Sequence, residues 1–128
     1  MRLVLDSSAV IAVLQDEPGH EEVVAALGIA ILGAINLAEV AAFLARKGAT
    51  VADVRDALAP LGLPVIAADE LLAVEAGCLG PLTRAAGLSL GDRFCLALAR
   101  RLDAPVLTTD RAWTRIADAV GVEVRLIR

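Results

Sequence analysis

A chain of 128 residues with 58% hydrophobic side chains is long enough to bury a core as one domain, and this composition excludes a disordered chain. The formal net charge of −4 argues against nucleic-acid binding by bulk basicity. The charge is uneven, because residues 1–80 carry 4 basic and 11 acidic side chains whereas residues 81–128 carry 8 basic and 5 acidic ones. The second part of the chain can therefore present a basic surface to an anionic substrate.

The predicted elements alternate along the chain. Short apolar runs that suit strands lie at 2–5, 29–32, 63–69, 104–110 and 122–127, the last as an edge strand. Helices are predicted at 7–15, 19–28, 34–46, 50–62, 90–102 and 111–120, with one more from Asp69 or Glu70 that Gly77, Gly80 and Pro81 divide in two. This order predicts an α/β domain with a largely parallel sheet of four to five strands, helices on both faces, and working groups at the carboxyl ends of the strands.

Three other features limit the class of protein. Cys78 and Cys95 lack a CxxC spacing or a histidine partner, so we expect two reduced, mostly buried thiols in a cytosolic protein. His20 is the only histidine and lies in a polar stretch, which disfavours a Ser-His-Asp triad. The apolar segment 27–45 approaches membrane-spanning length, but Glu39 within it would cost roughly 2.5–3.5 kcal/mol in a bilayer, so a span is disfavoured.

Four acidic residues occur where such a domain would bring them together. Asp6 follows one predicted strand and Asp110 ends another, and the carboxyl ends of these strands share one rim. Glu39 and Asp92 lie on helix faces that are otherwise mostly apolar, so both point inward. A divalent cation would offset the burial cost and mutual repulsion of these carboxylates, and oxygen-only ligands favour Mg²⁺ or Mn²⁺. Taken singly, an aspartate at a strand end is as often just a helix cap.

Four motifs carry a resemblance to a known family. The stretches "VLDSSAVIAVL", "INLAEVAAFL", "LSLGDRFCLALA" and "VLTTDRAW" resemble, in order and spacing, the motifs of PIN-domain ribonucleases, and more closely those of VapC-type toxins of toxin–antitoxin modules. The resemblance runs from residue 3 to about residue 115 and implies a three-layer PIN-like fold, with residues 1–128 forming a single PIN domain. By position, it places the family's acidic metal-site residues on Asp6, Glu39, Asp92 and Asp110, with Asp6 and Asp92 as the expected direct ligands.

The resemblance also implies supporting residues. Ser8 and Thr108 fall on positions whose hydroxyl groups orient carboxylates or water. Gly33 is a departure, since many relatives have a small hydroxyl residue there, and its loss removes one supporting hydrogen bond. Arg93 and Arg111 adjoin two of the acids and are candidate RNA phosphate contacts. Trp113 either stacks a base or, as we favour, packs against the sheet.

The function that the resemblance implies is a cytoplasmic, Mg²⁺- or Mn²⁺-dependent endoribonuclease acting on RNA of the tRNA or rRNA class. Metal-activated water would attack a phosphodiester in line and leave a 5′-phosphate and a 3′-hydroxyl. The resemblance also implies a homodimer held inactive by a VapB-type antitoxin. The helices at 8–14 and 50–60 are candidates for the apolar surface that such a partner covers, although either can equally be core.

Two other functions stay open at this point. A catalytically silent PIN-like binding module is disfavoured by the four intact acids. A metal-dependent α/β phosphatase would need a second aspartate two residues after Asp6, where Ser8 stands. It would also need a catalytic lysine, and the only lysine, Lys47, is predicted at a helix end.

Overall fold

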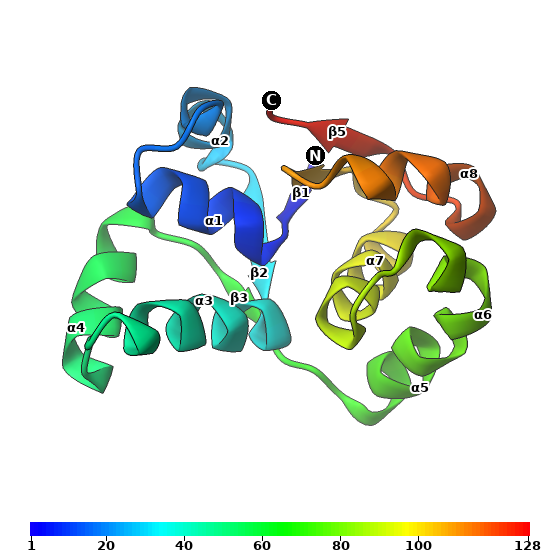
Figure 1. The fold of residues 1–128 in the computed structure, drawn as a ribbon, viewed down its shortest axis with the longest axis horizontal. Helices are drawn as coiled ribbons and strands as arrows, with labels where there is room; N and C mark the ends of the chain where they lie inside the picture. The colour runs from blue at the N-terminus through cyan, green and yellow to red at the C-terminus, as the bar shows by residue number, and fades with distance from the viewer.

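The structure, a computed structural model that describes residues 1–128, is a five-stranded sheet with helices on both faces (Figure 1). All neighbouring strands are parallel, in the order β3-β2-β1-β4-β5. The strands are β1 (Leu3–Leu5), β2 (Ala30–Gly33), β3 (Val65–Ile66), β4 (Val106–Thr108) and β5 (Val124–Leu126). The predicted parallel α/β architecture is confirmed, and β5 lies at the predicted edge.

The helices lie close to their predicted positions. They are α1 (Ser7–Leu14), α2 (His20–Ala26), α3 (Ala34–Arg46), α4 (Val51–Leu58), α5 (Glu70–Cys78), α6 (Gly80–Thr83), α7 (Leu90–Leu102) and α8 (Ala117–Val120), with 3₁₀ turns η1 (Ala59–Leu61), η2 (Arg84–Ala86) and η3 (Arg111–Arg115). The predicted division of the helix after Asp69 is confirmed. The longest helices have 13 residues, and none is long and apolar enough to cross a membrane.

Three predicted elements are shorter or more broken than expected. The strand at 63–69 is reduced to β3, because Pro64 has no N–H to donate and the Asp69 carboxylate turns to cap α5 by accepting the Leu72 N–H at 2.7 Å. The helix at 50–62 ends in η1, where Pro60 disfavours further α-helix and Gly62 adopts a left-handed φ of +61°. The helix at 111–120 is two pieces, η3 and α8.

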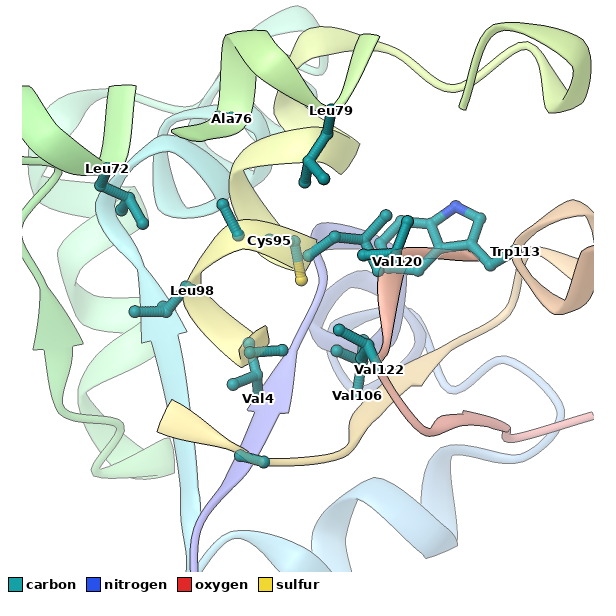
Figure 2. Packing of buried hydrophobic residues seen from close by; sticks show 14 of the residues in the cluster. Val4, Leu72, Ala76, Leu79, Cys95, Leu98, Val106, Trp113, Val120 and Val122 are labelled. Atoms are coloured by element: carbon teal, nitrogen blue, oxygen red, sulfur yellow. The ribbon is translucent and has the colours of Figure 1, made fainter. Parts of the chain in front are cut away.

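The core has two halves, one on each face of the sheet. Leu3 and Leu5 point to one face and Val4 to the other, because successive side chains of a strand alternate. The face that carries Leu3 and Leu5 is covered by α1 to α4. The face that carries Val4 is covered by α5 to α8, which gives the predicted three layers (Figure 1). In Figure 2, Val4 and Val106 of the sheet pack beneath α7 and Trp113.

Three expectations about burial are settled by this packing. Trp113 has no exposed surface and lies in the core beside α7, so packing is confirmed and base stacking by Trp113 is wrong (Figure 2). Cys95 is buried as expected, but Cys78 is exposed, because the buried face of α5 follows Leu72 and Ala76 and leaves residue 78 outside. Helix α1 is largely core, whereas α4 buries no residue fully and lines an apolar groove with α3 of about 580 Å³.

Candidate active site

Asp6 is the most deeply buried acid of the chain and lies at the carboxyl end of the central strand β1. Its side chain is 3% exposed. One oxygen, Oδ1, caps α1 by accepting the Ala9 N–H at 2.9 Å and the Ser8 hydroxyl at 2.7 Å. The other, Oδ2, accepts the Thr108 hydroxyl at 2.6 Å. Burial raises the pKa of Asp6 to about 6, against these hydrogen bonds, which lower it.

The Thr108 and Ser8 hydroxyls connect Asp6 to the end of the neighbouring strand. Because Leu5 pairs with Leu107, residue 108 comes to lie beside Asp6. The Thr108 oxygen also accepts the Asp110 N–H at 3.0 Å, and the Ser8 oxygen accepts the Thr109 N–H at 3.1 Å. Asp110 itself is exposed at this rim and caps η3 through the Ala112 N–H at 2.9 Å. These contacts fix the turn that carries Asp110 relative to Asp6.

Asp92 lies in the first turn of α7, where it takes part in capping the helix. Ser89 is the cap, and Asp92 is the third helical residue of a capping box. The Asp92 Oδ2 atom accepts the Ser89 N–H at 2.9 Å, while the Ser89 hydroxyl accepts the Asp92 N–H at 3.2 Å. The side chain is half-buried, and this burial raises the pKa of Asp92, to which the charge of Asp110 adds. Asp92 therefore faces the site with one oxygen, Oδ1, uncommitted.

Glu39 is held by a buried amide and by a glycine of the facing helix. Asn36, one turn earlier on α3 and 1% exposed, donates from Nδ2 to Glu39 Oε1 at 2.8 Å and to the Gly91 carbonyl at 3.2 Å. The Glu39 carboxylate fills the space that a side chain at Gly91 would need, since a Cβ at that position would lie 2.5 Å from Glu39 Cδ. Asn36 and Gly91 together fix this carboxylate between α3 and α7.

Three of the four acids share one electrostatic environment around Cys95, and Asp110 is coupled to them through Asp92. Burial raises the pKa of the Cys95 thiol well above its usual value, and the charges of Asp6, Asp92 and Glu39 raise it further. The charge of Asp92 also raises the pKa of Asp6, and that of Asp110 raises the pKa of Asp92. The acids therefore repel one another at a partly buried rim, which a cation would relieve.

The side-chain positions do not form a ready-made metal cage. No three of the His, Cys, Asp and Glu side chains converge closely enough to hold an ion as they stand. Three carboxylates nevertheless have one oxygen each without a hydrogen-bond partner, namely Asp92 Oδ1, Asp110 Oδ2 and Glu39 Oε2. An all-oxygen donor set with this excess of negative charge fits a hard divalent cation.

The arginines named from the sequence lie at the edge of this rim. Arg93 follows Asp92 on α7, is half-buried, and lowers the pKa of Asp92 through its charge. Arg111 is the exposed first residue of η3, immediately after Asp110. Neither guanidinium forms an ion pair with a carboxylate.

Sequence reasoning missed three residues that shape the site. Asn36 is the one polar neighbour on the apolar face around Glu39, and this was a usable signal for a hydrogen-bond partner. Ser89 and Asp92 have the spacing S-x-x-D, typical of a capping box, which predicts that Asp92 turns toward its own backbone. Gly91 gave no signal, because its importance depends on a contact with another helix.

A family model described as PIN domain matches residues 3–119. The chain belongs to the PIN domain family. This confirms the family inferred from the four motifs. No curated protein matches the chain in sequence.

Several solved structures share the fold of this PIN domain. VapBC2 from Rickettsia felis, bound to a DNA fragment from its promoter, has 15% identity, a TM-score of 0.74 and 98% coverage of both chains. DNA-bound VapBC from Salmonella typhimurium has 19% identity and a TM-score of 0.71, with 100% of this chain and 99% of that chain covered. FitAcB from Neisseria gonorrhoeae has 24% identity, a TM-score of 0.63 and 95% coverage of both chains. At these identities the likeness establishes the fold.

Proposed function

We propose that this PIN domain is a Mg²⁺- or Mn²⁺-dependent endoribonuclease and the toxin of a toxin–antitoxin module acting on cytoplasmic RNA of the tRNA or rRNA class. The observation that carries the proposal is the group of mutually repelling carboxylates at the carboxyl end of β1, with Asp6 buried among them. Membership of the PIN family supports the same conclusion.

The position of each residue indicates its proposed role in binding the ion. Asp6 and Asp92 would be direct ligands, because Asp6 is fixed by three donors and Asp92 keeps Oδ1 free. Glu39 and Asp110 would complete the ligand set with their free oxygens. Ser8 and Thr108 hold Asp6 in place. A bound dication would polarise a phosphate oxygen and make water nucleophilic near neutral pH.

A phosphatase is the weaker alternative. It requires a lysine close to the acids, and Lys47, the only lysine, follows the carboxyl end of α3 and donates to Gln15 Oε1 at 2.8 Å on the surface. A catalytically silent binding module would have no need for Asp6 as an anion in a buried position, where ionisation is unfavourable.

The decisive experiment is the substitution Asp92→Asn. The amide oxygen of the new side chain can still accept the Ser89 N–H, and the backbone N–H of residue 92 still donates to the Ser89 hydroxyl, so the capping box keeps both of its bonds and the fold is retained. We expect metal-dependent cleavage of total RNA to fall at least about 10²-fold in D92N, by analogy with the loss of one charge-stabilising group. Cleavage should require Mg²⁺ or Mn²⁺ and stop with EDTA.

The matched control is Asp56→Asn, which removes an exposed carboxylate on α4 and should leave cleavage unchanged. Cleavage that survives both EDTA and D92N would overturn the nuclease proposal. Hydrolysis of small phosphate esters without RNA cleavage would favour the phosphatase.

For the partner, we propose that a VapB-type antitoxin covers the groove between α3 and α4. The groove is lined by ten hydrophobic residues, among them Leu37, Val54 and Leu58, and it suits an apolar partner helix. The VapBC structures with this fold, which are toxin–antitoxin complexes, support a partner of that class.

We also propose that the chain forms a homodimer. Exposed Leu71 and Val74 on α5 offer apolar surface for this contact, and a measurement of the particle mass in solution tests it.

Placing a charge in the groove should separate toxicity from its neutralisation. Ala45→Arg adds a cation at an exposed groove position in the last turn of α3, where the helix dipole favours it. We expect A45R to arrest growth of a bacterial host like the unmodified protein but to escape relief by the co-expressed cognate antitoxin. Ala52→Arg, exposed on α4 outside the groove lining, should remain fully neutralised; equal relief of both variants would refute the groove assignment.

A further inference from the structure

A small polar hollow lies beside the first turn of α7, outside the carboxylate group. Its volume is about 280 Å³ and its lining is Gly80, Thr83, Arg84, Gly87, Leu88 and Arg93. Only one of these residues is hydrophobic. The hollow is therefore too polar for an apolar ligand, and it is roomy enough for a phosphate group.

Both arginines of the hollow are free of carboxylate partners. Arg101, Arg125 and Arg128 form ion pairs elsewhere on the surface, whereas Arg84 and Arg93, like the other arginines of the chain, form none. Neither guanidinium of the hollow lies within ion-pair distance of a carboxylate, although the charge of Arg93 acts on Asp92, and the planar forks of the two groups match phosphate oxygens.

Arg93 is also held in position. Its Nε atom donates to the Ser89 carbonyl at 3.4 Å, and a Cβ at Gly80 would lie 2.9 Å from its Nη1 atom. The guanidinium therefore lies against Gly80. Gly87 closes η2 with a φ of +69° and has open space around it, so the other side of the hollow stays accessible.

Two elements connect the hollow with the carboxylates. Arg93 is the neighbour of Asp92 in the same helical turn, and η2, which carries Arg84, packs against η3, which begins directly after Asp110. The carboxylates by themselves repel a polyanion, so a substrate strand reaching them needs cationic contacts close by.

We propose that Arg84 and Arg93 form a subsite for one backbone phosphate of an RNA strand, next to the phosphodiester that is cleaved. This subsite rests on the proposed nuclease function and specifies how the RNA substrate of that nuclease is held. It adds Arg84 to the proposed substrate contacts. It also specifies that Arg93 binds the same phosphate group as Arg84. The two arginines bind and place the strand, and the carboxylates act on the neighbouring bond.

The test is the double variant Arg84→Gln with Arg93→Gln, which keeps the aliphatic stems and removes both charges. Binding is measured in a D92N background with a single-stranded RNA hexamer without terminal phosphates, by fluorescence anisotropy across a salt series. We expect Kd to rise about tenfold and the slope of log Kd against log salt to fall by about 0.7 for each phosphate that is left without its cationic partner. In the chain with Asp92 intact, KM should rise while kcat stays nearly constant.

The control is Arg2→Gln with Arg55→Gln, which removes the same charge at two exposed positions remote from α7. An equal loss of RNA affinity in both double variants would show that only the net charge of the protein matters, and it would overturn the subsite. Competition by a 5′-mononucleotide as strong as that by the hexamer would make the hollow a site for free phosphomonoesters and overturn the backbone assignment.

The two proposals fail in different ways. If the unmodified chain cleaves RNA with metal and the double variant shows unchanged KM and Kd, the subsite is wrong and the nuclease stands. If the unmodified chain cleaves no RNA, the nuclease proposal falls whatever the hexamer binding. Unchanged fluorescence of the buried Trp113 verifies that a variant is folded. If the double variant does not fold, the same binding and kinetic measurements are made on the single variant Arg84→Gln, because the Arg84 side chain is exposed and forms no hydrogen bonds.

Discussion

Replacing Asp6 by asparagine is expected to stabilise the metal-free protein at pH 7.5 while abolishing RNA cleavage. The folded-state pKa of Asp6 is raised from 3.8 to about 6 by burial, so its ionisation above pH 6 works against folding. A shift of this size corresponds to up to about 3 kcal/mol of unfolding free energy. Asparagine keeps a carbonyl acceptor for the Ala9 N–H and the Ser8 hydroxyl and carries no charge, and its amide N–H can donate to the Thr108 oxygen in place of the bond that Asp6 accepted.

The pH dependence gives the prediction its sign. Between about pH 4 and pH 6 the folded chain binds a proton at Asp6 that the unfolded chain has released, so the stabilising effect of the raised pKa is complete below pH 4 and is lost as the pH rises through 6. The advantage of D6N over the unmodified protein should therefore be near zero at pH 4 and reach its maximum above pH 7. Urea unfolding in EDTA at a series of pH values measures it.

A matched variant and a metal titration complete this experiment. Asp56→Asn, an exposed change, should shift stability by no more than about 0.5 kcal/mol at any of these pH values. Added Mn²⁺ should stabilise the unmodified protein and leave D6N unaffected, because a ligand stabilises only the state that binds it. A D6N protein less stable than the unmodified one at pH 7.5 would show that the buried charge is not a liability.

Filling the space at Gly91 is expected to weaken metal binding and cleavage together. In Gly91→Ala the new Cβ would lie 2.5 Å from Glu39 Cδ and closer still to Oε2, so the carboxylate must leave its position. In Asn36→Ala the same carboxylate loses its 2.8 Å donor. We expect each variant to lower Mn²⁺ affinity, measured by calorimetry, and the cleavage rate by about 10- to 100-fold, as is typical of residues that orient metal ligands.

Gly77→Ala is the control for the glycine change. Gly77 lies inside α5, and a Cβ there would have no atom within 4 Å, so alanine should stabilise the protein by up to about 1 kcal/mol and leave Mn²⁺ binding unchanged. Combining Asn36→Ala with Gly91→Ala should give less than the sum of the single effects, because both act through Glu39. Full Mn²⁺ affinity in G91A would exclude Glu39 from the ion site.

The part of the site that lies on strands was predictable, because strand ends and register follow from apolar runs and parallel order. Asp6 follows β1, and Thr108, which ends β4, lies beside it because Leu5 and Leu107 are paired. The positions of Glu39 and Asp92 on inward-facing helix surfaces also followed from periodicity.

The rest depends on contacts that no local pattern encodes. The approach of α3 to α7 places Gly91 against Glu39, and only the packed fold reveals it. The orientation of Asp92 toward Ser89 reflects a competition between the helix end and the site for one carboxylate, which helical periodicity does not resolve. The shortness of β3 likewise reflects capping by Asp69 outweighing strand propensity.

The bond between Thr108 and Asp6 joins residues 102 positions apart in the chain. During synthesis, which proceeds from the amino terminus, Asp6 emerges long before its partner strand exists, and β1 has no neighbour on that side until β4 is made. A ribosome that stalls before residue 110 thus releases a polypeptide without an assembled carboxylate group. The order of the strands in the sheet therefore delays assembly of the carboxylate group until Asp110 has been synthesised.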